Sequence, residues 1–384
     1  MQFVQLTQKY YKFPKKIFDI RAQSLLARNT LIQFSTFYIK STSSRRTPNM
    51  FPSQSVEFDA SENIVCTHLD NFKIQMVADF WNSCLYPKNR RKPINIDMLE
   101  RQVFSKAYFD PNGFIIAWRG NKIVGLAHAG FGYSDDCNSI NYSQGVIPLI
   151  CYNDSSDVDD VLDALLISSE RYLLSKGATR IQIGTHYPDA PFYLGLIHSS
   201  DLPGVYLDEQ SVVSAAQRHG YTLTAPCSHF RRNLENTNQL APEFTALRRQ
   251  YSIQMEYCPT PPQWGRAIAM NGIIWSELSL IETGQGIVCS KTPAAKCALW
   301  VIDDIPKGDL IVVGLSQYDV QPEYRGRHLG FFLLTEAMRR LADQQVARIE
   351  IQVPDEWQSL IRLLSGNQFE LFAHSALFTK ECRE

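Results

Sequence analysis

The same order of secondary-structure signals occurs twice along the chain, and this duplication constrains the fold more than any other feature of the sequence. In each half, apolar runs predict a hairpin and a third strand, followed by a long helix, a further strand, a short helix and a last strand. Strands that alternate with helices predict an α/β architecture, and the repetition predicts two copies of one α/β domain in tandem.

Turn residues mark the expected element boundaries. In the first half, Asp110–Gly113 precedes one strand of the hairpin, and Gly120-Asn121 separates it from the next. The elements expected in this half are helices over 71–84 and 95–103, strands over 114–118, 122–131 and 145–152, a long helix from 158 that ends at Gly177, a strand over 179–184 and a helix over 211–219. Those expected in the second half are a hairpin over 273–281 and 286–302, a strand over 309–320, a helix over 329–341, a strand over 346–353, a short helix over 356–364 and a terminal strand pair over 369–379.

Composition gives the expected domain boundaries. Residues 1–55 form a basic extension, since the first 50 residues hold nine Lys or Arg and a single acidic residue. We expect this extension to be disordered; a transit-like segment, or translated sequence upstream of a true start at Met50, are the alternatives. One domain then covers 56–234, a polar and proline-containing linker region covers 235–262, and the second domain covers 263–384.

Charge and cysteine usage exclude several classes of protein. After residue 50 the chain carries 29 basic and 38 acidic side chains, which disfavours nucleic acid and suits a cationic amine as partner. The nine cysteines are scattered without a CxxC pair, and no histidine cluster has metal-ligand spacing, so we expect reduced thiols in a cytoplasmic protein without a metal site. No apolar run reaches the ~20 residues that a membrane span requires, so no membrane partner is expected.

The passage from the third strand into the long helix of the second half carries the strongest chemical signal. A strand that ends at Val320 runs through Pro322 into a short loop, and an amphipathic helix follows. Such a junction directs backbone amides and the positive end of a helix toward one point. The loop adds two permanent cations and two glycines, which together predict an anion cradle suited to a pyrophosphate; these residues are Arg325, Gly326, Arg327 and Gly330. Taken alone, the same turn is also compatible with a solvated helix start.

In context, this passage resembles the acetyl-CoA loop of the GNAT superfamily of N-acetyltransferases. The family pattern is Gln/Arg-x-x-Gly-x-Gly/Ala after a strand; Arg325 matches its first position and Gly330 its last, whereas His328 replaces the middle glycine. The resemblance covers about residues 60–380. It implies two tandem GNAT-like domains, each with a mixed sheet that is splayed at its centre and flanked by helices.

The resemblance also implies the donor and its ligands. Acetyl-CoA would lie with its pantetheine arm along the backbone of 317–320 and its pyrophosphate on the loop. The implied donor-binding residues are Tyr318, Val320, Arg325, Gly326, Arg327, His328, Leu329 and Gly330.

For catalysis, the resemblance implies transfer of an acetyl group to a neutral amine, which needs a general base and a proton for the departing thiolate. Asp319 and Glu277 are the candidate bases, and an exposed strand carboxylate is the alternative interpretation of each. Many relatives carry a tyrosine acid in the short helix near the C-terminus. Leu364 occupies that position here and Trp357 the position of a usual asparagine, so no acid is assigned.

The corresponding junction of the first half, residues 152–160, contains four aspartates, no glycine and no cation. Close carboxylates oppose a bound pyrophosphate, so this half is expected to lack a donor site and to be structural or to help bind the acceptor. His128 and Tyr193 could line an acceptor pocket there, although packing in the core is the favoured interpretation of both.

The sequence therefore predicts an acetyl-CoA-dependent N-acetyltransferase with a small-molecule or peptide amine as acceptor. The alternative is a non-catalytic acyl-CoA-binding or interaction protein derived from a GNAT enzyme.

Overall fold

The computed structural model describes most of the chain after residue 62. The described residues are 63–70, 73–84, 93–153, 157–184, 187, 190–194, 196–197, 204–234, 244–283, 292–303 and 311–382. All of them belong to one compact unit, residues 59–384. The predicted basic extension and Met50 lie outside the described residues, as does the polar stretch 235–243.

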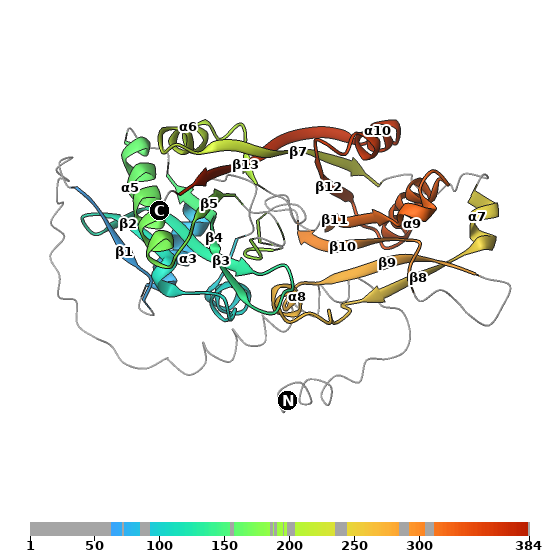
Figure 1. The fold of residues 1–384 in the computed structure, drawn as a ribbon, viewed down its shortest axis with the longest axis horizontal. Coiled ribbons are helices and arrows are strands. Elements are labelled where there is room, and N and C mark those ends of the chain that lie inside the picture. Colours follow the sequence, from blue (N-terminus) through green and yellow to red (C-terminus); the bar gives the residue numbers. More distant parts are fainter. Residues whose placement is uncertain are drawn as a thin grey trace, which may run out of the picture. The chain divides into compact units, whose positions relative to one another are not determined.

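The first half contains the expected sequence of elements (Figure 1). They are β1 (Ile64–His68), α3 (Ile74–Ser83), α4 (Ile96–Leu99), a π-helical turn (Glu100–Phe104), a 3-10 turn (Pro111–Gly113), β2 (Phe114–Arg119), β3 (Lys122–Tyr133), β4 (Ile140–Tyr152), α5 (Val158–Ser175), β5 (Arg180–Ile183), β6 (Val205–Tyr206), α6 (Gln210–Arg218) and β7 (Thr222–Asn233). The predicted hairpin is confirmed, and Gly177 follows α5 with a positive φ of 100°, as a helix-ending glycine should.

The second half repeats this sequence. Its elements are α7 (Phe244–Gln250), β8 (Tyr251–Tyr257), α8 (Trp264–Met270), β9 (Trp275–Glu282), β10 (Ala295–Asp303), β11 (Ile311–Val320), a 3-10 turn (Pro322–Tyr324), α9 (Leu329–Asp343), β12 (Arg348–Pro354), α10 (Gln358–Gly366) and β13 (Glu370–Glu381). The expected hairpin, long helix and short helix are confirmed. The expected terminal strand pair is wrong, because 370–381 forms one uninterrupted strand.

Part of the region predicted as a linker is regular structure. Residues 244–257 form α7 and β8, and β8 pairs antiparallel with β9. The period-two pattern of the strand, with Tyr251, Ile253, Met255 and Tyr257 alternating with polar residues, is typical of a half-buried strand. The segment was predicted to be a linker because half of its residues are polar.

The described strands form one mixed sheet in the order β1-β2-β3-β4-β5-β13-β7-β12-β11-β10-β9-β8, with β6 beside β13. The last strands of the two halves are exchanged: β13 pairs with β5 of the first half, and β7 pairs with β12 of the second. The two exchanged strands also pair with each other (Figure 1). Ala376 and Phe378 of β13 consequently pack into the core of the first half.

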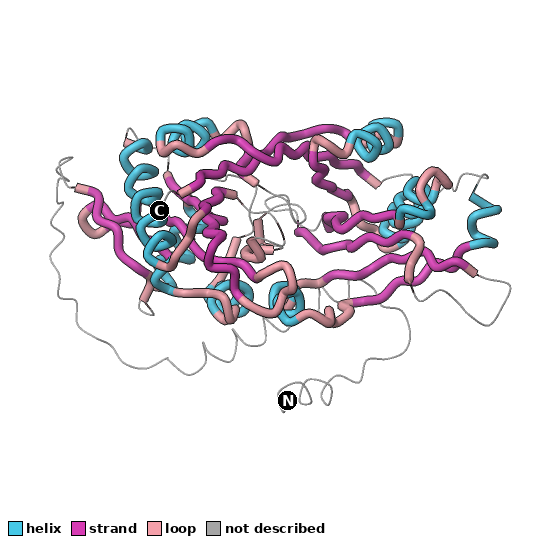
Figure 2. The backbone as a smooth tube through the Cα atoms, viewed as in Figure 1, coloured by secondary structure: helices cyan, strands magenta, loops and turns pink. Residues whose placement is uncertain are grey.

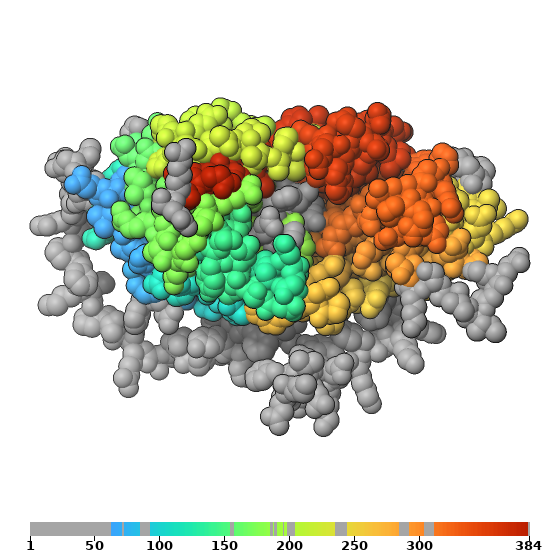
Figure 3. All heavy atoms as spheres, viewed as in Figure 1, coloured from blue at the N-terminus to red at the C-terminus, as the bar shows by residue number. Residues whose placement is uncertain are grey.

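The long helices cover the sheet with one apolar face each. In α5 the buried side chains include Val161, Leu162, Leu165 and Leu166, and they pack against the strands of the first half. Helix α9 lies against β9, β10 and β11 (Figure 2). Its segment also reaches the molecular surface (orange in Figure 3). Among the described residues, no helix has the length and apolar character needed to cross a membrane.

Candidate functional site

Strands β11 and β12 run side by side and then part. Their parallel ladder extends from Val312, opposite Arg348, to Leu315, opposite Ile351, and ends there. Strand β11 continues to Val320, whereas β12 continues to Pro354 with β7 as its partner on the other side. The backbone edges of the two strands therefore diverge beyond Leu315.

A bulge in β11 accounts for this divergence. On the β10 side, Lys296 lies opposite Asp319 while Ala298 lies opposite Ser316, so β11 contains one residue more than β10 between these pairs. Gln317, at the bulge, has a φ of 50°. A bulge bends its strand and increases the local twist, which turns the last residues of β11 away from β12.

The loop after β11 leads directly into α9. It begins with a 3-10 turn in which the Arg325 amide donates to the Pro322 carbonyl at 3.2 Å. The first helical bond of α9 joins the Phe332 amide to the His328 carbonyl at 3.0 Å. Within the described part of the chain, the amides of 327–330 have no acceptor. Donors of this kind at a helix start attract an anion.

Two arginines of the loop are held in place by neighbouring groups. Arg325 donates from Nε to the Val320 carbonyl at 2.9 Å, and its side chain remains 65% exposed. The Arg327 guanidinium lies 5.3 Å from the ring centre of Tyr324. The Tyr324 hydroxyl in turn donates to Glu282 at 2.9 Å. Both guanidinium groups thus flank the start of α9 without a buried carboxylate partner in the described structure.

Two residues fix the backbone at the helix start. The N-cap of α9 is His328, whose φ of 61° lies in the left-handed region that favours glycine. The replacement of the family's middle glycine therefore leaves a side chain in a strained backbone conformation. Gly330 lies against the buried hydroxyl of Tyr318, which has no hydrogen-bond partner among the described residues. Burial raises the pKa of this phenol, so it stays protonated.

The two candidate bases lie on one face of the sheet, on either side of Lys296. Lys296 is opposite Asp319 on β11, and its Nζ atom lies 3.6 Å from Glu277 Oε2. Glu277 is 24% exposed, whereas Asp319 is 47% exposed and accepts from Gln321 at 3.4 Å. Asp319 is thus associated with the loop, while Glu277 faces a pocket.

That pocket lies where α8 and the segment before it meet β9 and β10, and it has a volume of about 300 Å³. It is lined by residues 259–263 together with Arg266, Trp275, Glu277 and Lys296. A concave site of this size with a few converging charged groups is typical of a small-molecule site. Arg266 and Lys296 could not be predicted from the sequence, because neither belongs to a motif and only the fold brings them together.

No protein-family model matches this chain, and a search of curated proteins finds no relative. Comparison with solved structures gives clear matches. The chain is similar to a tandem GNAT protein from the clavulanic acid biosynthesis pathway, with a TM-score of 0.58 and 12% identity over 84% of this chain and 99% of the other. The described part of the chain has a tandem GNAT fold.

Two further GNAT structures match. One is the GCN5-related glucosamine N-acetyltransferase region of a fungal multi-domain GH3 β-N-acetylglucosaminidase, with a TM-score of 0.57 and 15% identity; the match covers 84% of this chain and only 38% of that protein. The other is a GCN5-related N-acetyltransferase from Sphaerobacter thermophilus, with a TM-score of 0.54 and 12% identity over 84% and 96% of the two chains. At these identities the likeness concerns the fold.

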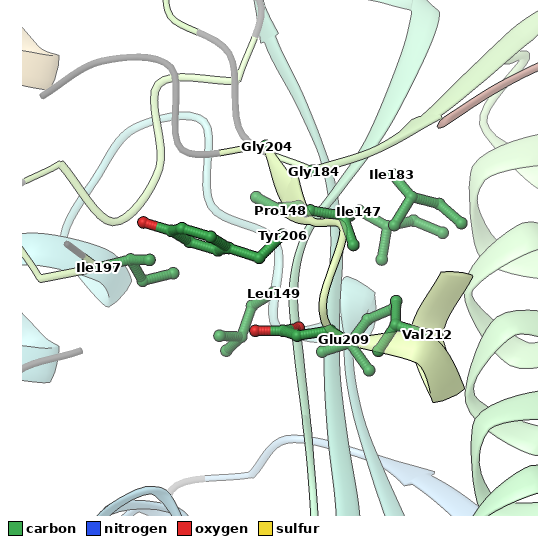
Figure 4. A pocket seen from close by; sticks show the side chains of 12 residues that line it. Ile147, Pro148, Leu149, Ile183, Gly184, Ile197, Gly204, Tyr206, Glu209 and Val212 are labelled. Atoms are coloured by element: carbon green, nitrogen blue, oxygen red, sulfur yellow. The ribbon is translucent and has the colours of Figure 1, made fainter. Parts of the chain in front are cut away.

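The first half has the same splay without the cationic loop. Strands β4 and β5 pair from Gln144 to Ile147 and then part, and a register shift again falls in β4. The space there measures only about 40 Å³, room for a few waters. Figure 4 shows the carboxylate of Glu209 between Leu149 and Val212, with Tyr206 above. The splay of the first half is therefore nearly filled by its own side chains.

The acidic junction of the first half is partly neutralised by its own arginines. Asp157, just before α5, is ion-paired with Arg119, and Asp159 lies 3.1 Å from the Arg218 guanidinium. Residues 154–156 lie outside the described residues. In the described part of this junction the cations pair closely with carboxylates, whereas in the second half Arg325 makes only a long contact of 3.9 Å with the half-exposed Asp319.

Two positions of α10 bear on the missing acid. Leu364 is fully buried, and Trp357 is the exposed N-cap of the helix. Neither side chain can protonate a thiolate.

His128 and Tyr193 belong to the core of the first half. Both are buried, and His128 Nδ1 lies 2.9 Å from the Tyr193 hydroxyl. Burial lowers the pKa of His128 to about 3, so the imidazole is neutral. Its surroundings are aromatic rings, which supports the interpretation as core packing.

Among the described residues, no cysteine forms a disulfide. Among the described residues no group of His, Cys, Asp and Glu could hold a metal ion. Cys289 lies outside the described residues.

Proposed function

We propose that this chain is an acetyl-CoA-dependent N-acetyltransferase whose second half binds the donor. One observation carries the proposal: β11 bulges, parts from β12 and leads into a loop with two arginines and unpaired amides at the start of α9. The first half lacks the equivalent loop, which favours the second half as the donor site. The proposed acceptor is a small-molecule or peptide amine. The proposed location of the protein is the cytoplasm.

The donor fits the second half in two parts. Its pyrophosphate binds the free amides of 327–330 and the guanidinium groups of Arg325 and Arg327. Its pantetheine arm runs along the edge of β11 that the splay leaves without a strand partner. There the amide groups of the arm form the backbone hydrogen bonds that a neighbouring strand would otherwise form. The Tyr318 hydroxyl, buried without a partner in the described structure, offers a further hydrogen bond near the phosphate end.

The chemistry is a direct transfer. The lone pair of the neutral amine attacks the thioester carbonyl carbon, a C–N bond forms, the C–S bond breaks, and coenzyme A leaves as a thiolate. The nitrogen loses its proton to a base, and solvent protonates the thiolate, because Leu364 and Trp357 provide no acid. Glu277 suits the base better than Asp319, since Glu277 lines a pocket large enough for an acceptor.

The test is thiol release from acetyl-CoA by the purified full-length protein with a broad panel of amines. The proposal predicts amine-dependent release of coenzyme A and an acetylated product of the expected mass. Tight acetyl-CoA binding with no turnover across the panel would instead support the non-catalytic alternative. The absence of the usual tyrosine acid favours that alternative.

A further inference from the structure

Beside the pocket proposed for the acceptor, two buried hydrogen-bond donors have no hydrogen-bond partner among the described residues. Arg266 of α8 lines the pocket and donates from Nη2 to the side-chain oxygen of Gln317. Its Nε–H is buried and has no partner among the described residues, and the same holds for the side-chain amide nitrogen of Gln317. Two buried N–H groups, one of them on a permanent cation, thus lack an acceptor at the bulge of β11.

These groups are held where they are at a cost. Gln317 has a positive φ, which is unfavourable for a residue other than glycine. A buried N–H without a hydrogen-bond acceptor is a second unfavourable contribution. A ligand that accepts hydrogen bonds from both N–H groups would satisfy them. The arrangement of these groups therefore favours ligand binding, although it does not stabilise the unliganded protein.

Helix α8 itself is anchored from the first half. The Lys106 amine donates to the carbonyls of Ile268 and Asn271, both at 2.8 Å, and so caps the C-terminal end of α8. This anchor fixes the helix that carries Arg266. The first half therefore positions one wall of the acceptor pocket.

The charged residues that line the pocket are Arg266, Glu277 and Lys296, and Lys296 Nζ lies 3.6 Å from Glu277 Oε2. Arg266 and Gln317 provide N–H donors at the bulge, while Glu277 provides a carboxylate from β9. A guanidinium can bind a carboxylate through two parallel hydrogen bonds, because its planar fork matches the two oxygens. The Glu277 carboxylate can bind the opposite charge, the ammonium group of the acceptor. This ammonium must lose a proton before its nitrogen can attack.

We propose that the acceptor is an amino-acid-type amine, whose carboxylate binds Arg266 and Gln317 while its nitrogen lies at Glu277. This inference rests on the proposed function and adds the chemical class of the acceptor.

The experiment compares matched acceptors. Glycine, β-alanine, 4-aminobutanoate and a set of L-amino acids are assayed beside their carboxamides, with KM expressed per neutral amine because the two series differ in amine pKa. The inference predicts that at least one carboxylate has a KM about tenfold or more below that of its carboxamide, since a charge-assisted hydrogen bond is lost in the amide.

Variants link this preference to the pocket. Arg266→Gln is expected to raise KM for the carboxylate about tenfold or more, with little change in kcat or in KM for the carboxamide. Arg266→Lys keeps the positive charge but not the planar fork, so its KM for the carboxylate should lie between those of the parent and Arg266→Gln. Arg362→Gln, an exposed position on α10, is the matched control and should change nothing. Retained acetyl-CoA binding shows that each variant is folded.

Two outcomes separate the inference from the function. Equal use of both series, or an equal effect of Arg266→Gln on both, overturns the carboxylate site while the acetyltransferase stands. No thiol release with any amine of either series overturns the proposed function, and the inference with it.

Discussion

The hydroxyl oxygen of Tyr318 lies 2.9 Å from the position that a Cβ atom on Gly330 would occupy. This contact joins the end of β11 to the start of α9, the two elements that form the proposed donor site. Since the hydroxyl is buried, it cannot move aside into solvent. We therefore predict that Gly330→Ala destabilises the protein by about 1–3 kcal/mol through overpacking and weakens acetyl-CoA binding, as measured by thermal unfolding and titration.

The partner residue supplies the control for this prediction. Tyr318→Phe removes the oxygen, and the next ring atom lies 3.7 Å from the same position, an ordinary contact. The double variant Gly330→Ala/Tyr318→Phe should therefore regain most of the lost stability. Gly366→Ala, where no atom lies within 4 Å, should be neutral or slightly stabilising. A double variant as unstable as Gly330→Ala would show that the contact is not the cause.

His328→Gly should favour both folding and donor binding. The residue has a φ of 61°, which glycine adopts without strain. We predict a gain of about 0–1 kcal/mol in unfolding free energy, because relief of strain is partly offset by the greater freedom of glycine in the unfolded chain. Acetyl-CoA should bind more tightly in calorimetry. Weaker binding by the variant would indicate that the imidazole itself contacts the donor.

Replacement of the two candidate bases should separate them. If Glu277 accepts the proton, Glu277→Gln lowers kcat by about 10²–10⁴-fold, the usual contribution of general base catalysis. Asp319→Asn, of matched size and charge change, should alter kcat only slightly because Asp319 is exposed and associated with the loop. The reverse ranking in steady-state kinetics would assign the base to Asp319.

Lys106 makes stability depend on pH. Burial lowers the pKa of its amine to about 8, below the value of an unfolded lysine. Between pH 8 and the unfolded value the unfolded chain binds more protons, so the Lys106 contribution to stability rises with pH in this window. The fall of the Lys106 pKa from 10.5 to about 8 corresponds to at most about 3.4 kcal/mol.

The comparison with Lys106→Met isolates this effect. The free energy of unfolding is measured with denaturant at pH 7.5 and at pH 10. From the lower to the higher pH, it should rise less, or fall more, in the variant than in the parent. Other titrating groups contribute equally to both proteins and cancel in this difference. The variant should be less stable at pH 10, where the parent amine is neutral and still caps α8. Parallel pH profiles would contradict a lowered pKa at Lys106.

The sequence predicted what depends on local pattern. The order of elements, Gly177 at the end of α5 and the junction from Val320 to Gly330 all follow from short-range periodicity and turn chemistry. The same pattern failed at 244–257, where polar residues in an outermost strand of the sheet resemble a linker. An outer strand needs only one apolar face, so its composition is less distinctive.

Long-range features were not predictable. The exchange of β7 and β13 depends on which strand ends meet in space, and neither strand carries a signal for its partner. The pocket residues Arg266 and Lys296 come from a short helix and a middle strand that no motif connects. The bulge at Gln317, which opens the splay, has no glycine or other mark in the sequence.

The central claim is that the loop of the second half binds the donor, and one measurement tests it most directly. Acetyl-CoA is titrated by calorimetry into the full-length protein, into Arg325→Ala/Arg327→Ala, and into Arg101→Ala/Arg362→Ala as a control with two surface arginines removed elsewhere. The account predicts binding by the parent and the control, with a loss of about tenfold or more per arginine in the loop variant. Equal binding by all three proteins, or no binding by the parent, would contradict it.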